Sequence, residues 1–351
     1  MLEIDMKVLI TGVDGYIGSI LAPRLMRDGY DVLGLDTGYY RSGWLYNDRN
    51  HSPYAPHTLN KDIRNISPED LNGIDAVVHL AELSNDPLGQ NNPEVTFKIN
   101  HQGSVHIATL CKEMGIERFI YTSSCSVYGA GTGDFLDETD KVNPQTAYAQ
   151  CKVNVERDVS ALADDKFTPV FLRNATAYGA SPRMRFDIVL NNLAGHAWTD
   201  KQITMTSDGS PWRPLVHIND ICHAIKCALE APKAAIHNEI FNVGHNDDNY
   251  RVRDIAEITA KIFEGCHISI GDNGGDNRSY RVNFDKINTK LPKFKCSWDA
   301  TAGAHQLHEF YKRIAMTPAV FTARPFTRLL QLEHLIQTNQ IDSDFFWADS
   351  Q

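Results

Sequence analysis

The stretch KVLITGVDGYIG, residues 7–18, decides the fold of this chain. An apolar run at 7–11 is rich in strand-forming residues. Three glycines in a GxxGxxG pattern follow at once (Gly12, Gly15 and Gly18), and an amphipathic stretch then runs through Met26. This order predicts a strand, a tight glycine turn and a helix whose N-terminus faces a diphosphate.

The next strand ends in an acid. Residues 31–35 form another short apolar run, and Asp36 follows it. A carboxylate at that position can accept hydrogen bonds from both ribose hydroxyls of an adenosine, and it repels a 2′-phosphate. The predicted cofactor is therefore NAD rather than NADP. A glycine triplet alone is weak evidence, and the alternative is an incidental α/β turn with a surface aspartate.

Strand and helix patterns alternate through most of the remaining chain. Strands are predicted at 75–81, 118–123, 168–173, 214–218 and 239–243, and helices at 93–114, 144–162, 186–198, 251–263 and 325–337. Asn219 and Asp220 can cap a further helix that reaches Glu230. This alternation predicts right-handed crossovers and a doubly wound parallel Rossmann sheet of the α/β class.

Segments without a clear period are expected to be loops. They are 38–60, the loop-like 174–185, the exposed hairpin or loop at 203–212, and the turn-rich 271–276. After the first of them, Asp62 and Ile63 could end a third strand. Ligands of such sheets bind beyond the carboxyl ends of the strands, where we expect Ser84 and residues 123–126. The apolar tail after residue 316 is expected to pack on its own domain or on a partner subunit.

Composition narrows the class of protein. The 351 residues carry a formal charge of −10, which argues against general affinity for nucleic acid or anionic lipid. The N-terminus lacks signal-peptide features, and no run approaches the length of a membrane span, so a cytoplasmic protein without a membrane segment is expected. Seven cysteines without metal-site spacing favour reduced thiols and no bound metal.

Tyr148 and Lys152 lie four residues apart in the predicted helix 144–162, so their side chains share a face. A tyrosine that acts as a base near neutrality needs its pKa lowered by about three units, or roughly 4 kcal/mol. A fixed neighbouring ammonium can supply part of that stabilisation. The spacing alone also fits a surface tyrosine beside a solvated lysine.

Together these motifs resemble the extended short-chain dehydrogenase/reductase family, specifically NAD-dependent nucleotide-sugar epimerases and dehydratases related to UDP-galactose 4-epimerase. The resemblance spans roughly residues 6–315. It rests on TGVDGYIG at 11–18, Asp36, DI at 62–63, HLA at 79–81, Asn100, SSCSVYG at 123–129, YxxxK at 148–152 and RPLVHIND at 213–220.

The resemblance implies roles for individual residues. Tyr148 is the expected general base, Lys152 lowers its pKa and holds the nicotinamide ribose, and Ser124 orients the sugar hydroxyl. The implied cofactor residues are Gly12, Gly15, Tyr16, Ile17, Gly18, Asp36, Asp62, Ile63, Leu80, Ala81, Asn100, Ser123, Tyr148 and Lys152. The implied substrate residues are Ser84, Ser124, Cys125, Asn174, Tyr178, Arg183, Arg185, Arg213 and Arg278.

Two segments bear on the reaction. The 4,6-dehydratases of the family carry Asp-Glu after the serine that matches Ser124, whereas this chain has Cys125 and Ser126, which disfavours dehydration. Cys125 is either a small buried side chain or a thiol that exchanges a proton with the sugar. The loop SPRMR at 181–185 resembles a subgroup that includes C4 dehydrogenases, so Arg183 and Arg185 either bind substrate or are solvated loop charges.

The expected activity is epimerisation of a nucleotide-diphosphate sugar, at C4, through a transient 4-keto sugar. The alternatives are a C4 dehydrogenase or ketoreductase, a 4,6-dehydratase and a non-catalytic NAD-binding sensor. The resemblance also implies a homodimer paired through helices near 95–114 and 147–162. The expected domains are an NAD-binding domain (1–175 with about 214–245), a discontinuous substrate domain (about 176–213 with 246–315) and a helical extension (316–351).

Overall fold

A parallel sheet of seven strands organises the computed structural model, which describes residues 6–46, 54–84, 92–131, 133–205, 207–270 and 278–348. The strand order is β11-β7-β5-β4-β1-β2-β3. The strands are β1 (Lys7–Thr11), β2 (Asp31–Asp36), β3 (His57–Asn60), β4 (Ala76–His79), β5 (Arg118–Ser124), β7 (Thr168–Asn174) and β11 (Glu239–Val243). Each hydrogen-bonded pair among them is parallel, as the alternation with helices predicts.

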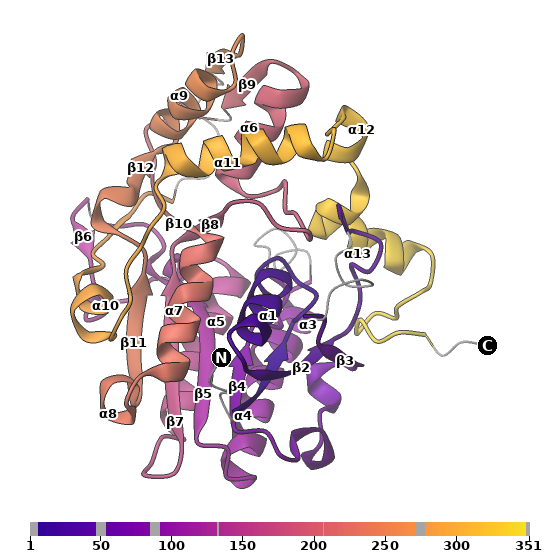
Figure 1. Cartoon of the computed structure of the whole chain (residues 1–351), viewed down its shortest axis with the longest axis vertical. Coiled ribbons are helices and arrows are strands. Elements are labelled where there is room, and N and C mark those ends of the chain that lie inside the picture. Colours follow the sequence, from indigo (N-terminus) through magenta and orange to yellow (C-terminus); the bar gives the residue numbers. More distant parts are fainter. Residues whose placement is uncertain are drawn as a thin grey trace.

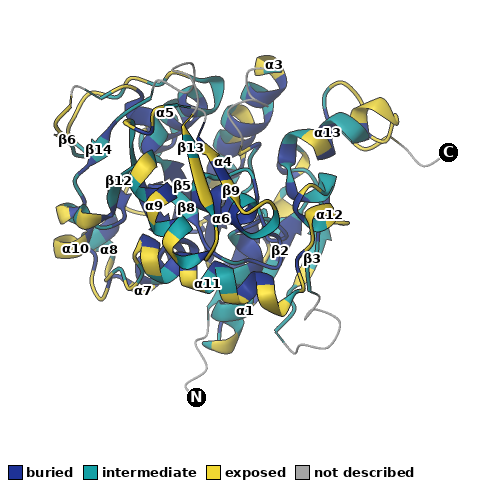
Figure 2. Cartoon of the chain, turned by 90° about the horizontal axis from the view of Figure 1, so that it is seen from above, coloured by how far each residue is buried: buried dark blue, intermediate teal, exposed yellow. Residues whose placement is uncertain are grey.

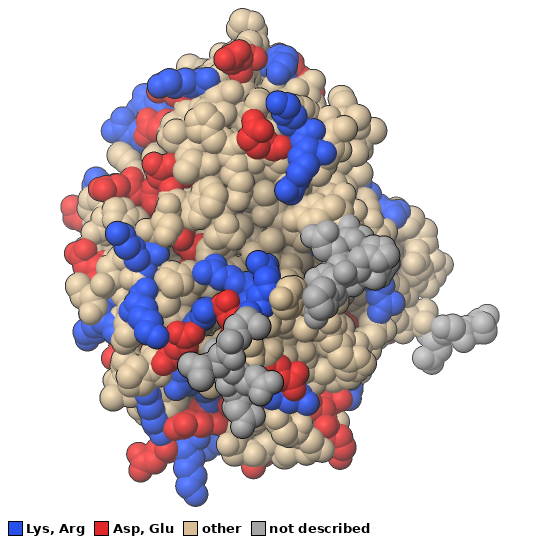
Figure 3. Space-filling model, in the orientation of Figure 1, with Lys and Arg blue, Asp and Glu red and all other residues tan. Residues whose placement is uncertain are grey.

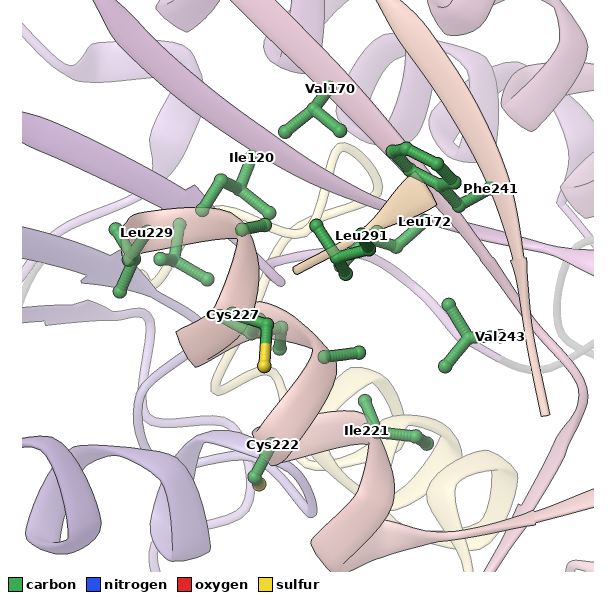
Figure 4. Packing of buried hydrophobic residues seen from close by; sticks show 14 of the residues in the cluster. Ile120, Val170, Leu172, Ile221, Cys222, Cys227, Leu229, Phe241, Val243 and Leu291 are labelled. Atoms are coloured by element: carbon green, nitrogen blue, oxygen red, sulfur yellow. The ribbon is translucent and has the colours of Figure 1, made fainter. Parts of the chain in front are cut away.

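Helices cover both faces of this sheet (Figure 1). On one face lie α1 (Gly18–Arg27) and α7 (Ile218–Glu230). On the other lie α4 (Ser104–Glu113) and α5 (Ala147–Ser160). The alternation of a strand explains the division, because neighbouring residues of β1 point into different cores. Figure 4 shows α7 side chains packed against residues from β5, β7 and β11.

A smaller α/β part lies beyond the carboxyl ends of the main strands (Figure 1). Its sheets pair β8 (Thr176–Tyr178), β10 (Trp212–His217) and β12 (Asn249–Arg251), and separately β9 (Gln202–Met205) with β13 (His267–Ile270). Its helices are α6 (Val189–Thr199), α9 (Val252–Ile262) and α11 (Ala300–Arg313), which share a third apolar core. The chain therefore enters this part twice, before and after α7.

Short elements complete the connections. They are η1 (Ile63–Asn65), η2 (Pro68–Leu71), α3 (Pro93–Thr96), the π-helical η3 (Phe97–Gly103), η4 (Cys125–Tyr128), β6 (Phe135–Leu136), α8 (Lys233–Ile236), η5 (Asn246–Asp248), β14 (Arg281–Val282), α10 (Asp285–Lys290), α12 (Pro318–Phe321), η6 (Arg324–Phe326) and α13 (Arg328–Gln337). The predicted helix 93–114 is thus α3, η3 and α4 in succession.

Several segment predictions are corrected. The third strand, β3, lies inside the segment expected to be a loop and ends before Asp62, because it pairs only with β2 at the sheet edge. β8 interrupts the loop expected at 174–185. Residues 202–205 are a strand paired with β13 rather than a hairpin. His217, not Asn219 or Asp220, caps α7. The loop expected at 271–276 lies outside the described residues.

The C-terminal extension folds back onto the main sheet of its own chain. Leu332, Leu335 and Phe345 are buried in the apolar core that contains Leu9 and Leu35 of the sheet. Figure 2 shows α13 at the edge of the molecule, with dark blue buried segments in the interior strands and exposed residues on outer elements. No described helix is long and apolar enough to cross a membrane. Figure 3 shows basic and acidic residues interspersed on one face.

Candidate active site

A cavity of about 780 Å³ lies at the carboxyl ends of the main strands. Most of the predicted site residues line it: Gly12, Gly15, Tyr16, Ile17, Gly18, Asp36, Asp62, Ile63, Leu80, Ala81, Ser84, Ser123, Ser124, Tyr148, Lys152, Asn174, Arg185, Arg213 and Arg278. Asn100, Cys125, Tyr178 and Arg183 do not. The fold therefore gathers residues from nearly every strand end into one space.

The glycine turn is closed by contacts that exclude larger side chains. Gly12 has φ +70°, and a Cβ there would lie 2.9 Å from the Ala81 backbone. A Cβ on Gly18 would lie 2.4 Å from the Gly12 carbonyl oxygen, which fixes the start of α1 against the turn. A Cβ on Gly15 would meet only that same oxygen, so its outer side is open. The turn thus presents the N-terminus of α1 to the cavity.

Two backbone N–H donors fix the orientation of the Asp36 carboxylate toward a ligand. The Gly38 N–H donates to one carboxylate oxygen at 2.7 Å, and the Asp14 N–H donates to the other at 3.0 Å. Burial raises the pKa of Asp36, and the nearby Asp14 carboxylate raises it further. Two acids at this position favour a ribose with free hydroxyls and oppose a phosphorylated one.

A buried hydrogen-bond network supports the loop after β4. His79 links the hydroxyls of Thr11 and Ser104 at 2.7 and 2.8 Å, and burial lowers the pKa of its imidazole to about 3. The Asn100 amide accepts from the Leu83 N–H and donates to the Leu83 carbonyl. Asn100 therefore positions the cavity wall through its neighbour instead of lining the cavity, which corrects its expected direct contact with the cofactor.

Tyr148 and Lys152 lie on one face of α5, as their spacing predicts. Thr146 begins the helix, and its hydroxyl accepts from the Ala149 N–H at 3.1 Å. The Lys152 ammonium lies 5.3 Å from the centre of the Tyr148 ring and donates to the Thr122 carbonyl of β5. The side chain of Lys152 is only 3% exposed, so its charge acts in a dry environment.

Glu82 lines the cavity, although it was not predicted from the sequence as a site residue. Its carboxylate lies 2.5 Å from the Lys152 ammonium, and the Tyr121 hydroxyl donates to its other oxygen. Burial raises the pKa of Glu82, although Lys152 and Tyr121 oppose that rise. Burial alone would lower the pKa of Lys152, but Glu82 and Tyr148 raise it overall. The sequence signal was an acid directly after the HLA motif.

Of the two serines at the end of β5, Ser123 supports the structure and Ser124 lines the cavity. The Ser123 hydroxyl donates to Glu156 at 2.5 Å, and Glu156 is itself paired with Arg173. The Ser124 hydroxyl faces the cavity and accepts from the Ser126 N–H at 3.1 Å. Ser126, not expected as a site residue, also lines the cavity, and its hydroxyl is buried without a partner among the described residues.

Cys125 points away from the cavity, in contrast to the expectation that it contacts substrate. Its side chain is 0% exposed, and its thiol donates to the Arg173 carbonyl oxygen at 3.1 Å. Burial raises the pKa of the thiol well above its ordinary value. η4 is a 3-10 helix, in which successive side chains are rotated by about 120°, so Cys125 faces the core while Ser126 lines the cavity. Of the two open readings, the small buried side chain describes the structure.

Arg185 joins two loops above the cavity. Its guanidinium makes a two-point contact with Asp187 at 3.0 and 2.9 Å, and it also donates to the hydroxyl and carbonyl of Ser84. Elsewhere in the cavity wall, Arg213 donates to the backbone carbonyls of Trp212 and Arg278. Arg185 is therefore ion-paired rather than solvated.

Two predicted substrate residues are structural instead. The Tyr178 ring is fully buried and packs edge-on against His217, outside the cavity. Arg183 is 1% exposed, donates to the Asp14 carbonyl oxygen at 2.7 Å and stacks on Trp44. Both were expected in the substrate site because of their sequence position. Their side chains turn into the packing below the loop, where Arg183 braces the glycine turn.

The arrangement fits an adenine dinucleotide. The glycine turn is open on the cavity side at Gly15, and Asp36 is oriented for ribose hydroxyls. At the other end, Asn174 has a buried amide oxygen without a partner in the described part of the chain, and it lines the cavity. Buried polar atoms of this kind require a ligand or water.

Comparison with known proteins identifies relatives. Residues 8–244 match the profile of the NAD dependent epimerase/dehydratase family. Protein CapI of Staphylococcus aureus is 30% identical over 65% of this chain and 70% of its own. The UDP-glucuronate 4-epimerase of Thermodesulfobacterium geofontis is 25% identical over 81% of this chain and 85% of its own. A UDP-N-acetyl-alpha-D-glucosaminuronate decarboxylase of Bacillus cytotoxicus is equally distant, at 25% identity.

Solved structures share the fold. TunA, an NDP-hexosamine 5,6-dehydratase, superposes with a TM-score of 0.78 at 21% identity and covers 88% of this chain and 98% of its own. A UDP-glucuronic acid 4-epimerase from Bacillus cereus has a TM-score of 0.77 at 24% identity and covers 88% of this chain and 100% of its own. Part of this chain therefore has no counterpart in either structure.

Proposed function

Because this chain belongs to the NAD-dependent epimerase/dehydratase family, we propose that it epimerises a nucleotide-diphosphate sugar at C4 through a transient 4-keto sugar. NAD is the cofactor of the family and of this enzyme. One observation carries the proposal: Tyr148 and the buried Lys152 share a face of α5 and border the same cavity as Ser124.

Each side chain then has a separate task. When bound, NAD supplies the hydride acceptor and its reduced form returns the hydride. Tyr148, as phenolate, takes the proton of the C4 hydroxyl, and the Lys152 ammonium favours the phenolate. Ser124 holds the reacting hydroxyl in position. When the keto sugar presents its other face, Tyr148 returns the proton as the hydride comes back.

The side chains after Ser124 support epimerisation over dehydration. Elimination of water from a sugar needs an acid and a base at neighbouring carbons. Here Cys125 is buried away from the cavity, and Ser126 offers a neutral hydroxyl. Glu82 is the nearest carboxylate described beside Lys152, and it is held in an ion pair. Neither of the two described residues that follow Ser124 is therefore an acid that would divert the keto sugar at C5 and C6.

The far end of the cavity suits a nucleotide diphosphate. Arg213 and Arg278 line it, and cations of this kind bind phosphate oxygens. The buried Asn174 amide oxygen, which has no partner among the described residues, lines the same cavity and can accept a hydrogen bond from a ligand. UDP-glucose and UDP-glucuronate are the first substrates to test, because relatives of this chain carry the names of epimerases for these sugars.

The test uses purified enzyme with each UDP-sugar and NMR detection of the C4 epimer. Tyr148→Phe is expected to lose about 10²- to 10⁴-fold in turnover while still binding NAD. Full turnover of that variant with every accepted sugar would contradict the mechanism. Anaerobic mixing separates the dehydrogenase alternative, since lasting NADH absorbance without an epimer would indicate net oxidation.

We also propose a homodimer. Its interface is formed by η3, α4 and α5 of one subunit, which pack against the same three elements of the other subunit. His101 and Asp158 already join these helices within one chain at 2.7 Å. Light scattering coupled to size-exclusion chromatography measures the mass directly. A monomeric mass at micromolar concentration would contradict this assembly.

A further inference from the structure

Arg328 is a buried cation that the proposed mechanism does not use. It is the first residue of α13, is 4% exposed and lines the same cavity as Tyr148 and Asp36. Its guanidinium lies 3.9 Å from the centre of the Tyr40 ring. The C-terminal extension thus brings a charged side chain into a cavity that the main sheet and the smaller α/β part also line.

The charge of Arg328 is offset only in part, and without a direct ion pair, by the carboxylates of Asp187 and Asp36. Among the described residues no carboxylate forms an ion pair with it, whereas the neighbouring Arg185 is paired with Asp187. Burial lowers the pKa of Arg328, and the Arg185 cation lowers it further. Tyr40, Asp187 and Asp36 raise this pKa but do not cancel the fall. A cation in the first turn of a helix also opposes the helix dipole. This position is therefore costly without a ligand, and an anion would relieve it.

The position of Arg328 indicates which anion. Arg328 interacts electrostatically with Asp36 and Arg185, and Arg185 interacts with Tyr148. Asp36 marks the adenosine end of the cofactor site, and Tyr148 marks the nicotinamide end. A dinucleotide that reaches both ends has its diphosphate between them. Arg328 lines the same cavity as the glycine turn, and its interactions with Asp36 and Arg185 point to a position between the two ends.

The extension is anchored to the loop that follows β2 (Figure 1). The Gln331 amide donates to the Tyr39 carbonyl oxygen at 2.8 Å, and the Tyr39 hydroxyl donates to the Phe345 carbonyl oxygen. The Trp347 indole donates to the Thr37 carbonyl oxygen at 2.7 Å. These contacts fix α13 to the same loop that carries Tyr40, so the Arg328 side chain is preorganised.

We propose that Arg328 binds the diphosphate of the NAD cofactor, which makes the C-terminal extension a part of the cofactor site. The bound diphosphate supplies the ion-pair partner that Arg328 lacks among the described residues. This inference concerns cofactor binding and does not depend on which sugar is turned over or on the fate of its ketone.

The test compares full-length variants by titration calorimetry with ADP-ribose, adenosine and UDP. Arg328→Met keeps an apolar side chain against Tyr40 and removes the charge. It is expected to weaken ADP-ribose binding about ten- to a hundredfold, because hydrogen bonds between charged groups are lost, and to leave adenosine binding unchanged. Arg328→Lys should recover part of the ADP-ribose affinity. Release of labelled NAD from the loaded enzyme should accelerate in parallel.

Arg313→Met is the matched control. Its guanidinium also lies over aromatic rings, those of Tyr46 and Phe310, but it does not line the cavity. This variant should bind ADP-ribose like the parent. Unchanged ADP-ribose affinity in Arg328→Met would overturn the proposal. An equal loss of affinity for adenosine would assign Arg328 a structural role, and a loss of affinity confined to UDP would assign Arg328 to the substrate site. Either result would also overturn the proposal.

Discussion

The ammonium nitrogen of Lys152 lies 2.5 Å from a carboxylate oxygen of Glu82, and both side chains are almost completely buried. The pair joins α5 to the loop after β4 directly beside Tyr148. A carboxylate in this place holds the ammonium and also offsets the positive charge that favours the phenolate. Glu82 is thus expected to set the pH range in which Tyr148 works.

Glu82→Gln is expected to move the rising limb of the kcat pH profile to lower pH by about one unit. The amide keeps the shape of the side chain but removes the negative charge, so the Lys152 cation lowers the pKa of Tyr148 more strongly. Tyr121→Phe is the control, because it removes only a hydrogen bond to Glu82 and should move the limb less. A limb that stays in place or moves upward in Glu82→Gln would refute this role.

Cys125→Ala and Ser126→Ala are expected to have different effects, because Cys125 lies in the core and Ser126 lines the cavity. The Cys125 variant should lose about 1–2 kcal/mol of stability through lost packing, with unchanged turnover. The Ser126 variant should keep its stability and raise KM, because its hydroxyl faces the cavity. Denaturant unfolding and steady-state kinetics measure both. Solvent deuterium that enters the sugar in the parent and not in Cys125→Ala would instead show a catalytic thiol.

Asp36→Ala is expected to weaken NAD binding about tenfold or more, because two charge-assisted hydrogen bonds to ribose are lost. The same change should narrow the preference for NAD over NADP. Asp14→Asn leaves the ribose acceptor in place and lowers the local negative charge, so it should improve NADP binding and leave NAD binding unchanged. Binding titrations with both dinucleotides provide the check, and an unaltered preference in both variants would disprove the assignment.

Asp248 gives a pH-dependent stability with a defined sign. Burial raises its pKa to about 6, although a hydrogen bond from the Tyr250 hydroxyl opposes the rise. An acid that holds its proton more tightly when folded lowers the free energy of unfolding as pH rises from about 4 to about 6. Asp248→Asn should therefore be more stable than the parent by up to about 3 kcal/mol at about pH 8, with little difference at about pH 4.

The neighbouring Asp247 provides the matched control for this change. Its side chain is 92% exposed, so Asp247→Asn should leave stability unaltered at both pH values. Thermal or denaturant unfolding at each pH gives the comparison. If Asp248→Asn stabilised the protein equally at both pH values, titration of this carboxyl would not be the cause.

Some expectations stay predictions. The division into NAD-binding, substrate and C-terminal domains stays a prediction, and so does the homodimer. The roles of the cavity-lining residues in binding and catalysis follow from their position and await the experiments above.

Local residue spacing determined which features could be predicted from the sequence alone. Strand, glycine turn and helix follow one another within residues 7–27, and a spacing of four residues places Tyr148 and Lys152 on one helical face whatever lies around it. Parallel topology then brings the strand ends together at one edge. The fold, the cofactor site and the pair on α5 could therefore be predicted from residue order.

Tertiary structure decided what depends on contacts between distant residues. Glu82 meets Lys152 across two elements, and the turn of η4 sends Cys125 into the core while Ser126 faces the cavity. The positions of Arg183 and Arg328 could not be predicted from the sequence either. Arg183 is a loop residue whose buried side chain supports the glycine turn, and Arg328 is a residue of the C-terminal extension that lines the cofactor cavity. Periodicity fixes the face on which a side chain lies, but its partner depends on how separate elements pack.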